Sequence, residues 1–308
     1  MTVRVFDGMG LAVARVREEF PDLEVHDLAG PLPPVDGARE ILFGGWDDEK
    51  LLPVLARGID WVQLPGTGID GIPAHVFDDV RVVTCSRGAS AVPISEYVLA
   101  VMLAFAKGLP AFWLDEAPDR WNFQRMDTLA GKTLGIVGLG GIGAAVARRA
   151  LAFDMQVRAM RRTATPSPIP DVEVVTNLAD LIRDAHHVVL AAPGTAKTQH
   201  LLDADAFAAM RDGVHVVNIA RGTLVDQEAL RAALDSGKVA RASLDTVEPE
   251  PLPEGHWLFT HPRVFLTPHS SWASPDLLGV AIDIFCANLA HYLADEPLEH
   301  VVDLAEGY

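Results

Sequence analysis

Short apolar runs alternate with stretches of helical periodicity along the whole chain. In the first third, such runs fall at residues 3–6, 40–43, 61–64 and 81–84, with Gly, Pro and Asp clusters between them. From residue 133 on, a second series follows at 133–137, 156–160, 187–191, 214–219, 241–244 and 264–266. Strands that alternate with helices are typical of βαβ units. The pattern therefore predicts an α/β protein with two Rossmann-like domains, each built on a parallel sheet.

The helical stretches indicate where these two domains meet. A long apolar helix is expected at 94–107, and the segment 109–127, which contains Trp113 and Trp121, lacks a clear period and is interpreted as an irregular arm. Asp203 and Asp226 are the expected N-caps of two later helices. The last helix, 275–293, is long enough to return to the first domain. We therefore predict a discontinuous, flavodoxin-like domain at 1–98 with 284–308, and a second domain at 99–283 that includes the arm.

Composition narrows the class of protein. The chain of 308 residues has 25 basic and 42 acidic side chains, a net charge of −17 that disfavours nucleic-acid and membrane-surface partners. Two cysteines cannot form a disulfide framework. The N-terminus lacks the pattern of a signal peptide, and the longest apolar run, 97–106, is too short to span a bilayer. A soluble, cytoplasmic protein is expected.

A glycine-rich turn at 138–143 matches the G-x-G-x-x-G pattern, directly after an apolar strand and before an alanine-rich helix. In this context Gly138 permits a tight turn, Gly140 lets the backbone approach a pyrophosphate, and Gly143 lets helix and strand pack closely. The helix N-terminus adds partial positive charge for the anion. The turn predicts a dinucleotide-binding domain; a glycine-rich turn without a ligand is the alternative.

The end of the next strand indicates which dinucleotide binds. An NAD site usually has an acidic residue about 20 residues after the turn. Arg161 and Arg162 stand there instead, and the next acid is Asp171. Guanidinium groups suit a 2′-phosphate by charge and geometry. NADP(H) is therefore favoured over NAD(H), the alternative being a solvated basic loop.

Polar residues follow three strands of the second domain: Arg221, Asp245 and His269. The carboxyl ends of parallel strands share one edge of a sheet, so these groups should gather there, and Glu250 lies shortly after Asp245. His269 could exchange a proton with the oxygen of a 2-keto acid, with Glu250 fixing its tautomer and favouring its protonated form. Arg221 could bind the substrate carboxylate.

Other readings of these residues stay open. His256 and His261 are the main rivals of His269 for the proton-transfer role, and Arg221 could merely hydrogen-bond carbonyl groups at its strand end. No close cluster of metal ligands is found in the sequence, so no metal is expected.

Ordered sequence blocks extend these predictions. They are G-T-G-I-D at 66–70, P-I-S-E-Y at 93–97, G-K-T-L-G-I-V-G-L-G at 131–140, N-I-A-R-G-T-L-V-D at 218–226, and T-P-H at 267–269. With them the chain resembles the D-isomer-specific 2-hydroxyacid dehydrogenases along nearly its whole length.

The resemblance implies roles for individual residues. It implies that Arg221, Glu250 and His269 form the catalytic trio, and that backbone N–H groups around Thr67, Gly68 and Ile69 bind the substrate carboxylate together with Arg221 and His269. The expected cofactor-binding residues are Gly138, Gly140, Gly141, Ile142, Gly143, Arg161, Arg162, Ala192, Ile219, Ala220, Arg221, Asp245, His269 and Ser271. Asp245 is expected to meet the nicotinamide carboxamide, and a homodimer is expected to form through the cofactor domain and the arm.

Departures from the family pattern refine the expectation. Arg161 replaces the usual acid, which supports NADP(H). Gly194 replaces a larger residue near the cofactor, and Trp272 stands where smaller residues are common, so it could narrow the substrate pocket or the cofactor face. The chain ends at Tyr308, without the regulatory domain of some phosphoglycerate dehydrogenases, which favours a glyoxylate or hydroxypyruvate reductase.

The sequence thus predicts an NADP(H)-preferring D-2-hydroxyacid dehydrogenase that works as a 2-keto acid reductase. Two alternatives remain: a dinucleotide-sensing scaffold like the corepressors that resemble this family, and oxidation of formate or phosphite within the same family.

Overall fold

The computed structural model describes residues 2–44, 51–69, 72, 77, 80–122 and 125–307. The chain divides into two compact units, here called the first unit (Met1–Ser90 with Ser274–Tyr308) and the second unit (Ala91–Ala273). The second unit begins at Ala91 and ends at Ala273, whereas the sequence predicted a domain that begins at 99 and ends at 283. The sequence-based domain limits stay predictions.

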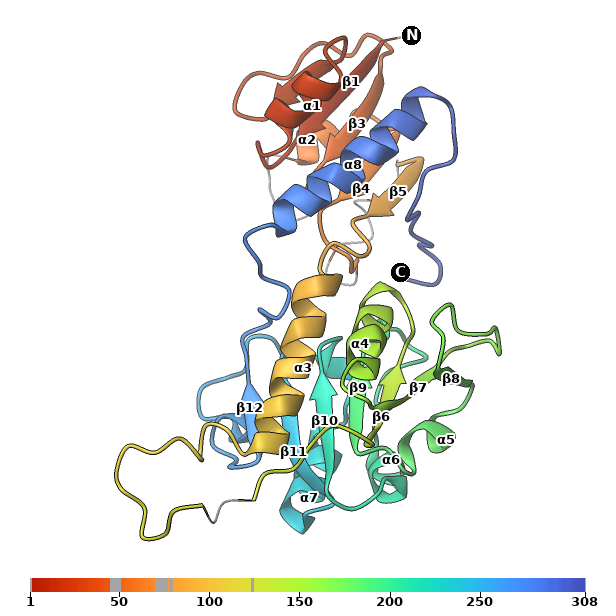
Figure 1. Ribbon diagram of the computed structural model, residues 1–308. Helices are drawn as coiled ribbons and strands as arrows, with labels where there is room; N and C mark the ends of the chain where they lie inside the picture. Colours follow the sequence, from red (N-terminus) through yellow and green to blue (C-terminus); the bar gives the residue numbers. More distant parts are fainter. Residues whose placement is uncertain are drawn as a thin grey trace. The chain divides into compact units, whose positions relative to one another are not determined.

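The first unit is built on a five-stranded parallel sheet with the order β2-β1-β3-β4-β5, the order of flavodoxin-like folds (Figure 1). Alternate residues of its strands face opposite sides, so Phe6 and Leu42 belong to one apolar cluster and Val5 and Ile41 to the other. Phe285 of the returning helix α8 packs in the second cluster. Its elements are β1 (Val3–Asp7), α1 (Val13–Glu19), β2 (Glu24–Asp27), β3 (Arg39–Phe43), α2 (Leu52–Leu55), β4 (Trp61–Leu64), β5 (Val82–Cys85) and α8 (Leu277–Leu293).

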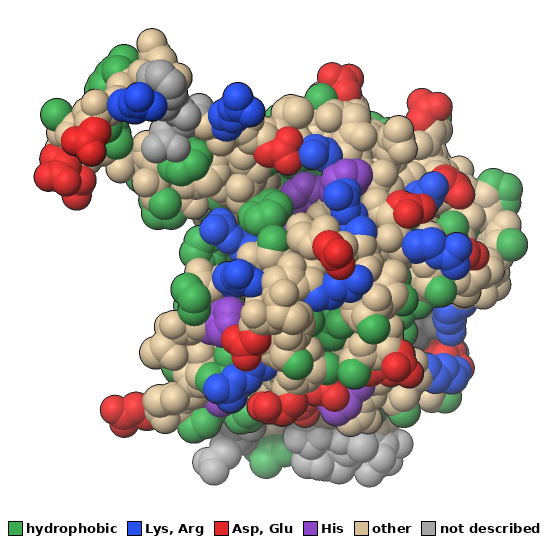
Figure 2. All heavy atoms as spheres, turned by 90° about the horizontal axis from the view of Figure 1, so that it is seen from below, with side chains coloured by type: hydrophobic (Ala, Val, Ile, Leu, Met, Phe, Trp, Pro, Cys, Tyr) green, Lys and Arg blue, Asp and Glu red, His purple; other side chains and the backbone are tan. Residues whose placement is uncertain are grey.

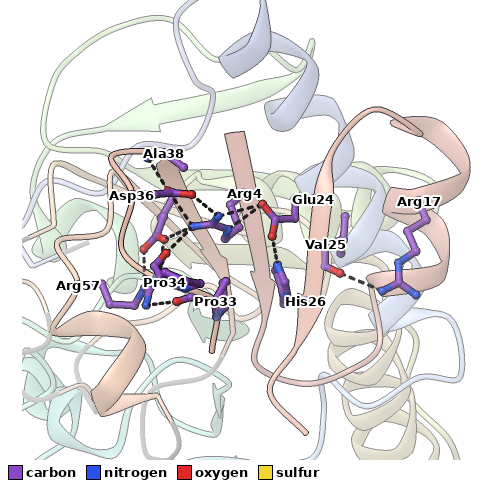
Figure 3. A network of polar contacts seen from close by, with 11 residues as sticks. Arg4, Arg17, Glu24, Val25, His26, Pro33, Pro34, Asp36, Ala38 and Arg57 are labelled. Atoms are coloured by element: carbon purple, nitrogen blue, oxygen red, sulfur yellow. Dashed lines mark hydrogen bonds and ion pairs between the residues drawn. The ribbon is translucent and has the colours of Figure 1, made fainter. Parts of the chain in front are cut away.

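A buried arginine fastens one loop of the first unit to this sheet. Arg4 of β1 lies between three carboxylates, at 3.0 Å from Glu24, 3.1 Å from Asp36 and 2.8 Å from Glu40. Figure 3 shows Arg4 with Glu24 on one side and Asp36 on the other. Glu40 also accepts a hydrogen bond from Nε of Arg57 at 2.7 Å. Arg4 is only 3% exposed, so its charge needs these partners. The network fixes the loop that carries Asp36.

The second unit contains a seven-stranded parallel sheet with the order β12-β11-β10-β9-β6-β7-β8. The strand order reverses between β6 and β9, and in such sheets ligands bind at the carboxyl ends of the strands at this point. The strands are β6 (Thr133–Val137), β7 (Gln156–Met160), β8 (Val172–Val175), β9 (His187–Leu190), β10 (Val214–Asn218), β11 (Val239–Leu244) and β12 (Val264–Leu266). The two parallel sheets confirm the predicted fold class.

Helices cover both faces of this sheet. Val98 of α3 and Val146 of α4 pack in one apolar cluster, whereas Leu181 of α5, Phe207 of α6 and Leu230 of α7 pack in the other. Figure 1 shows α3 and α4 side by side on one face. The helices are α3 (Ala91–Lys107), α4 (Gly141–Leu151), α5 (Leu178–Ile182), α6 (Ala204–Ala209) and α7 (Gln227–Ser236), with short 3-10 turns η2 (Gly222–Leu224) and η3 (Trp257–Phe259).

The second sheet buries a pair of imidazoles away from the glycine-rich turn. The Nδ1 atoms of His187 on β9 and His215 on β10 lie 3.2 Å apart, and Nε2 of His215 lies 2.9 Å from the hydroxyl of Ser243. The ring of Phe105 from α3 lies against His215. Burial lowers the pKa of His187 to about 4 and the pKa of His215 well below its ordinary value. Both rings are therefore neutral near pH 7.

Charges are mixed on the surface. Figure 2 shows Lys and Arg side chains scattered among Asp and Glu over the face that it presents, without a continuous basic patch among the coloured residues. Within the described ranges, no helix is both long and apolar enough to cross a membrane.

Candidate active site

Three neighbouring strands are each followed by one of the predicted site residues, two of the catalytic trio and one expected to bind the cofactor. Arg221 lies shortly after β10, Asp245 directly follows β11, and His269 lies shortly after β12. Because β10, β11 and β12 pair in parallel, their carboxyl ends share one edge of the sheet. The structure thus brings these residues to the same edge, as the strand pattern predicted.

Glu250 and His269 form a direct pair. Oε2 of Glu250 lies 2.7 Å from Nδ1 of His269, and Oε1 of Glu250 accepts a hydrogen bond from the backbone N–H of Val247 at 2.9 Å. Both side chains are partly exposed, at 36% for Glu250 and 40% for His269. The carboxylate selects the tautomer that carries its proton on Nδ1. Nε2 is then the ring nitrogen that can exchange a proton with a substrate.

The turn that holds His269 is fixed from the end of β11. The backbone N–H of His269 donates to the carbonyl of Asp245 at 2.9 Å. The carboxylate of Asp245, which is 2% exposed, accepts from the N–H groups of Ser270 and Ser271 at 2.9 and 3.0 Å and from the hydroxyl of Thr267. Asp245 therefore shapes this turn, and its expected contact with the nicotinamide carboxamide stays a prediction.

Arg221 is held by close packing of two loops. Its Nη1 donates to the carbonyl of Ala220 at 2.7 Å, the kind of strand-end bond that the sequence left open as an alternative. A Cβ atom on Gly194 would lie 2.9 Å from Cγ of Arg221, and one on Gly222 would lie 2.0 Å from the carbonyl carbon of Val247. The two glycines thus give the Arg221 side chain its room and bring its loop against the loop that leads to Glu250.

The glycine-rich turn fits a dinucleotide. Gly138 has a φ of 96°, and a Cβ atom on Gly143 would lie 2.0 Å from the carbonyl oxygen of Gly138, so the chain's own packing requires both glycines. Gly140 differs, because nothing lies within 4 Å of the place of its Cβ. Gly140 is also the N-cap of the 11-residue helix α4, without a capping side chain. Exposed N–H groups at this open helix end suit a pyrophosphate.

The other expected cofactor residues lie at strand ends along the same sheet. Arg161 directly follows β7, and its Nη1 donates to the carbonyl oxygen of Pro166 at 3.2 Å. The remaining members are Ile142 in the first turn of α4, Arg162 after β7, Ala192 after β9, Ile219 and Ala220 after β10, and Ser271 after β12. Their contacts with a cofactor stay predictions.

The rivals of His269 serve local structure. Nδ1 of His256 accepts a hydrogen bond from the N–H of Leu258 at 3.4 Å and caps η3. Nε2 of His261 lies 3.3 Å from the carboxylate of Asp235. Neither imidazole has the pairing with a glutamate at the sheet edge that His269 has. Among the described residues, no three His, Cys, Asp or Glu side chains gather as a metal ion requires.

The residues expected to bind the substrate carboxylate belong to the first unit. Thr67, Gly68 and Ile69 follow β4, and Ile69 is 8% exposed within the core of that unit. Asp70 of the same motif lies outside the described residues. The substrate-binding role of this segment stays a prediction.

Comparison with known proteins identifies the family. The model of the "D-isomer specific 2-hydroxyacid dehydrogenase, NAD binding domain" matches residues 99–271, more than half of the chain. The chain belongs to the D-isomer specific 2-hydroxyacid dehydrogenase family. It is therefore an NAD(P)-dependent oxidoreductase, as the sequence predicted.

Individual relatives agree with this assignment. The hydroxypyruvate reductase of Thermotoga maritima is 33% identical, and the match covers 80% of this chain and 81% of that protein. The D-3-phosphoglycerate dehydrogenase of Methanocaldococcus jannaschii is 32% identical, but the match, over 78% of this chain, spans only 46% of that protein.

Solved structures share the fold. A D-isomer specific 2-hydroxyacid dehydrogenase from Xanthobacter autotrophicus in complex with NADPH and MES has a TM-score of 0.84 at 28% identity, covering 100% of this chain and 99% of that one. The NADPH-dependent glyoxylate/hydroxypyruvate reductase of Sinorhizobium meliloti, in complex with NADP and sulfate, has a TM-score of 0.83 at 25% identity and is covered completely.

Proposed function

We propose that this enzyme is an NADP(H)-preferring reductase of small 2-keto acids, with glyoxylate or hydroxypyruvate as the substrate class. The observation that carries the proposal is the Glu250–His269 pair, 2.7 Å apart, at the same sheet edge as Arg221. A paired imidazole and a fixed cation are what reduction of a 2-keto acid needs. Relatives named hydroxypyruvate reductase and glyoxylate/hydroxypyruvate reductase support the substrate class.

The second unit would bind the cofactor along its glycine-rich turn. The N-terminus of α4 beside Gly140 would hold the pyrophosphate, and Arg161 and Arg162 would bind the 2′-phosphate of the adenosine ribose. When bound, the nicotinamide supplies the hydride that reduces the keto carbon. NADPH and NADP in the two similar structures support the preference for the phosphorylated cofactor.

His269 would handle the proton of the reaction. Its Nε2 would donate a proton to the keto oxygen and take it back in the oxidative direction. Glu250 accepts a hydrogen bond from the Nδ1–H of His269, which leaves Nε2 as the ring nitrogen that exchanges the proton. Arg221 stays charged throughout, so it would bind the substrate carboxylate rather than transfer a proton.

The proton-transfer role can be tested with purified enzyme. We expect His269→Gln to lower kcat by about 100-fold or more with any 2-keto acid that the wild type reduces, because the proton donor is lost. NADPH affinity, measured by fluorescence titration, should survive. His256→Gln, at a histidine that caps η3, serves as the matched control. An unchanged kcat in His269→Gln would remove His269 from this role.

Cofactor preference has its own test. Arg161→Asp should shift the ratio of kcat/KM for NADPH over NADH toward NADH, because a carboxylate repels the 2′-phosphate and can accept hydrogen bonds from ribose hydroxyls. An unchanged ratio would contradict the proposed phosphate contact.

A substrate screen tests the proposed activity. Initial rates should be measured with both cofactors for glyoxylate, hydroxypyruvate, pyruvate, phenylpyruvate and 3-phosphohydroxypyruvate. NADPH binding without turnover would favour the scaffold alternative, and turnover of formate or phosphite alone would favour oxidation of those anions.

We also propose that two copies of the chain associate through the arm. An apolar groove of about 690 Å³ in the second unit is lined by Leu109, Trp113 and Phe265, among others, and Trp113 is 71% exposed. Exposed apolar surface of this kind is typical of association sites. Trp113→Glu should convert a dimer to a monomer in sedimentation analysis, whereas Phe153→Glu, at another exposed aromatic residue of the unit, should not. A wild type that sediments as a monomer would refute the proposal.

A further inference from the structure

Trp272 makes an unusual contact next to the proposed proton donor. Its indole N–H donates to the backbone carbonyl of His269 at 2.6 Å. The tryptophan is 43% exposed, so the ring is only partly packed against the protein. The contact therefore orders a partly exposed side chain against the turn that carries His269.

His269 needs such support because its backbone is in the left-handed region. Its φ is 50°, a conformation that non-glycine residues rarely adopt unless the surroundings hold them there. The peptide before His269 is held by the bond from its N–H to the carbonyl of Asp245. The peptide after it is held at both ends, by the bond from Trp272 to its carbonyl and by the bond from its N–H, which belongs to Ser270, to the carboxylate of Asp245. Rotation of either peptide would turn the imidazole relative to Glu250.

The rest of the turn does not depend on the indole. The N–H of Ala273 donates to the carbonyl of Ser270 at 2.9 Å, and the N–H groups of Ser270 and Ser271 donate to Asp245. These bonds close the turn by themselves. Loss of the indole N–H should therefore remove one of the two bonds that hold the peptide after His269, without unfolding the loop.

We propose that Trp272 is a positioning residue for His269. The indole N–H fixes the carbonyl of His269 and so keeps its imidazole aligned with Oε2 of Glu250 at 2.7 Å and its Nε2 in place for proton transfer. The inference rests on the proposed function of His269 as proton donor. Misalignment of a proton donor slows the chemical step more than it weakens substrate or cofactor binding.

Kinetics of two variants separate this positioning role from a purely steric role, in which the ring only limits the size of the substrate pocket. Trp272→Phe keeps an aromatic ring but removes the N–H, and Trp272→Ala removes both. We expect each variant to lower kcat about five- to tenfold, the effect of one lost hydrogen bond, with KM for the keto acid and Kd for NADPH within about twofold of the wild type. The proposal is wrong if Trp272→Phe keeps the wild-type kcat and only Trp272→Ala alters how KM depends on the size of the substrate. The ring would then have a steric role alone.

A matched control is available in the same unit. The indole N–H of Trp257 is buried and finds no acceptor in the part of the chain that the structure describes. Trp257→Phe therefore removes an indole N–H that holds nothing, and it should keep kcat within about twofold of the wild type. A tenfold loss in Trp257→Phe as well would show a general effect of the substitution and would overturn the assignment to Trp272.

Crystal structures of the wild type and Trp272→Phe make the test independent of turnover. We expect the left-handed φ of His269 and its short distance to Glu250 in the wild type, and a shifted carbonyl and a longer Nδ1–Oε2 distance in the variant. Unchanged geometry in the variant would overturn the proposal even where kcat falls. If the wild type reduces no 2-keto acid, the proposed function fails, and the two crystal structures still decide whether the indole positions His269.

Discussion

Acidification should destabilise the second unit by protonating buried imidazoles, including that of His187. His187 is 3% exposed and faces His215 across β9 and β10. Burial, reinforced by the neighbouring His186 and by the positive charge of Lys132, lowers its pKa from 6.5 to about 4. Asp127 opposes this shift but does not cancel it. Between these two pKa values the unfolded chain binds a proton that the folded chain does not.

The sign and size of the effect follow from proton linkage. Because the pKa of His187 is lower in the folded state, stability falls as the pH falls below the unfolded value of 6.5. The loss amounts to roughly 2 kcal/mol between pH 7 and pH 5 and levels off near roughly 3 kcal/mol below the folded pKa. His215, whose pKa is lowered by burial as well, acts in the same direction.

His187→Asn isolates this contribution. The asparagine amide keeps a hydrogen-bonding group near Nδ1 of His215 but does not titrate. Urea unfolding followed by circular dichroism at pH 7 and pH 5 should give a pH-dependent loss of stability about 2 kcal/mol smaller in the variant than in the wild type.

The matched control is His200→Asn. His200 is exposed and has a φ of 47°, a conformation that asparagine tolerates well. The His200→Asn variant should lose as much stability on acidification as the wild type does. If His187→Asn and His200→Asn lose equal amounts between the two pH values, the buried imidazole is not the source of the acid sensitivity.

The packing of the site makes three further outcomes measurable. Gly194→Ala should lower kcat/KM roughly tenfold with NADPH affinity intact, because the new Cβ would lie 2.9 Å from Cγ of Arg221; an unchanged kcat/KM would contradict this. Gly143→Ala should weaken NADPH binding in fluorescence titrations by roughly 100-fold or more, since its Cβ would lie 2.0 Å from the backbone of the glycine-rich turn. Tyr97→Phe should lower the free energy of unfolding in urea by about 1 kcal/mol, because it removes a 2.9 Å bond to Thr267, and equal stability would show that this bond contributes nothing.

Much of the fold could be predicted because its physical causes are local. Central parallel strands are buried on both faces, so they read as continuous apolar runs. Asp203 accepts a bond from Ala206 and Asp226 from Ala229, which confirms both expected N-caps. The strands β2 and β8 were missed because both are short edge strands whose apolar residues are interrupted by charged ones, such as Glu24 in β2 and Glu173 in β8.

The candidate site was predictable only in part. A polar residue directly after an apolar strand is visible in the sequence, and this signal identified Arg221, Asp245 and His269. Contacts between loops are not visible there. The room that Gly194 gives to Arg221 and the bond from Trp272 to the carbonyl of His269 depend on how distant segments approach each other. No local pattern encodes that approach.

The backbone contact at Gly222 has a consequence for the engineering of this enzyme. A Cβ atom on Gly222 would lie only 2.0 Å from the carbonyl carbon of Val247, so the backbones of the loops that carry Arg221 and Glu250 are in direct contact. An insertion or deletion in one loop would force a compensating change in the other. Libraries aimed at bulkier substrates should therefore leave both loops at their natural length and place diversity in other segments.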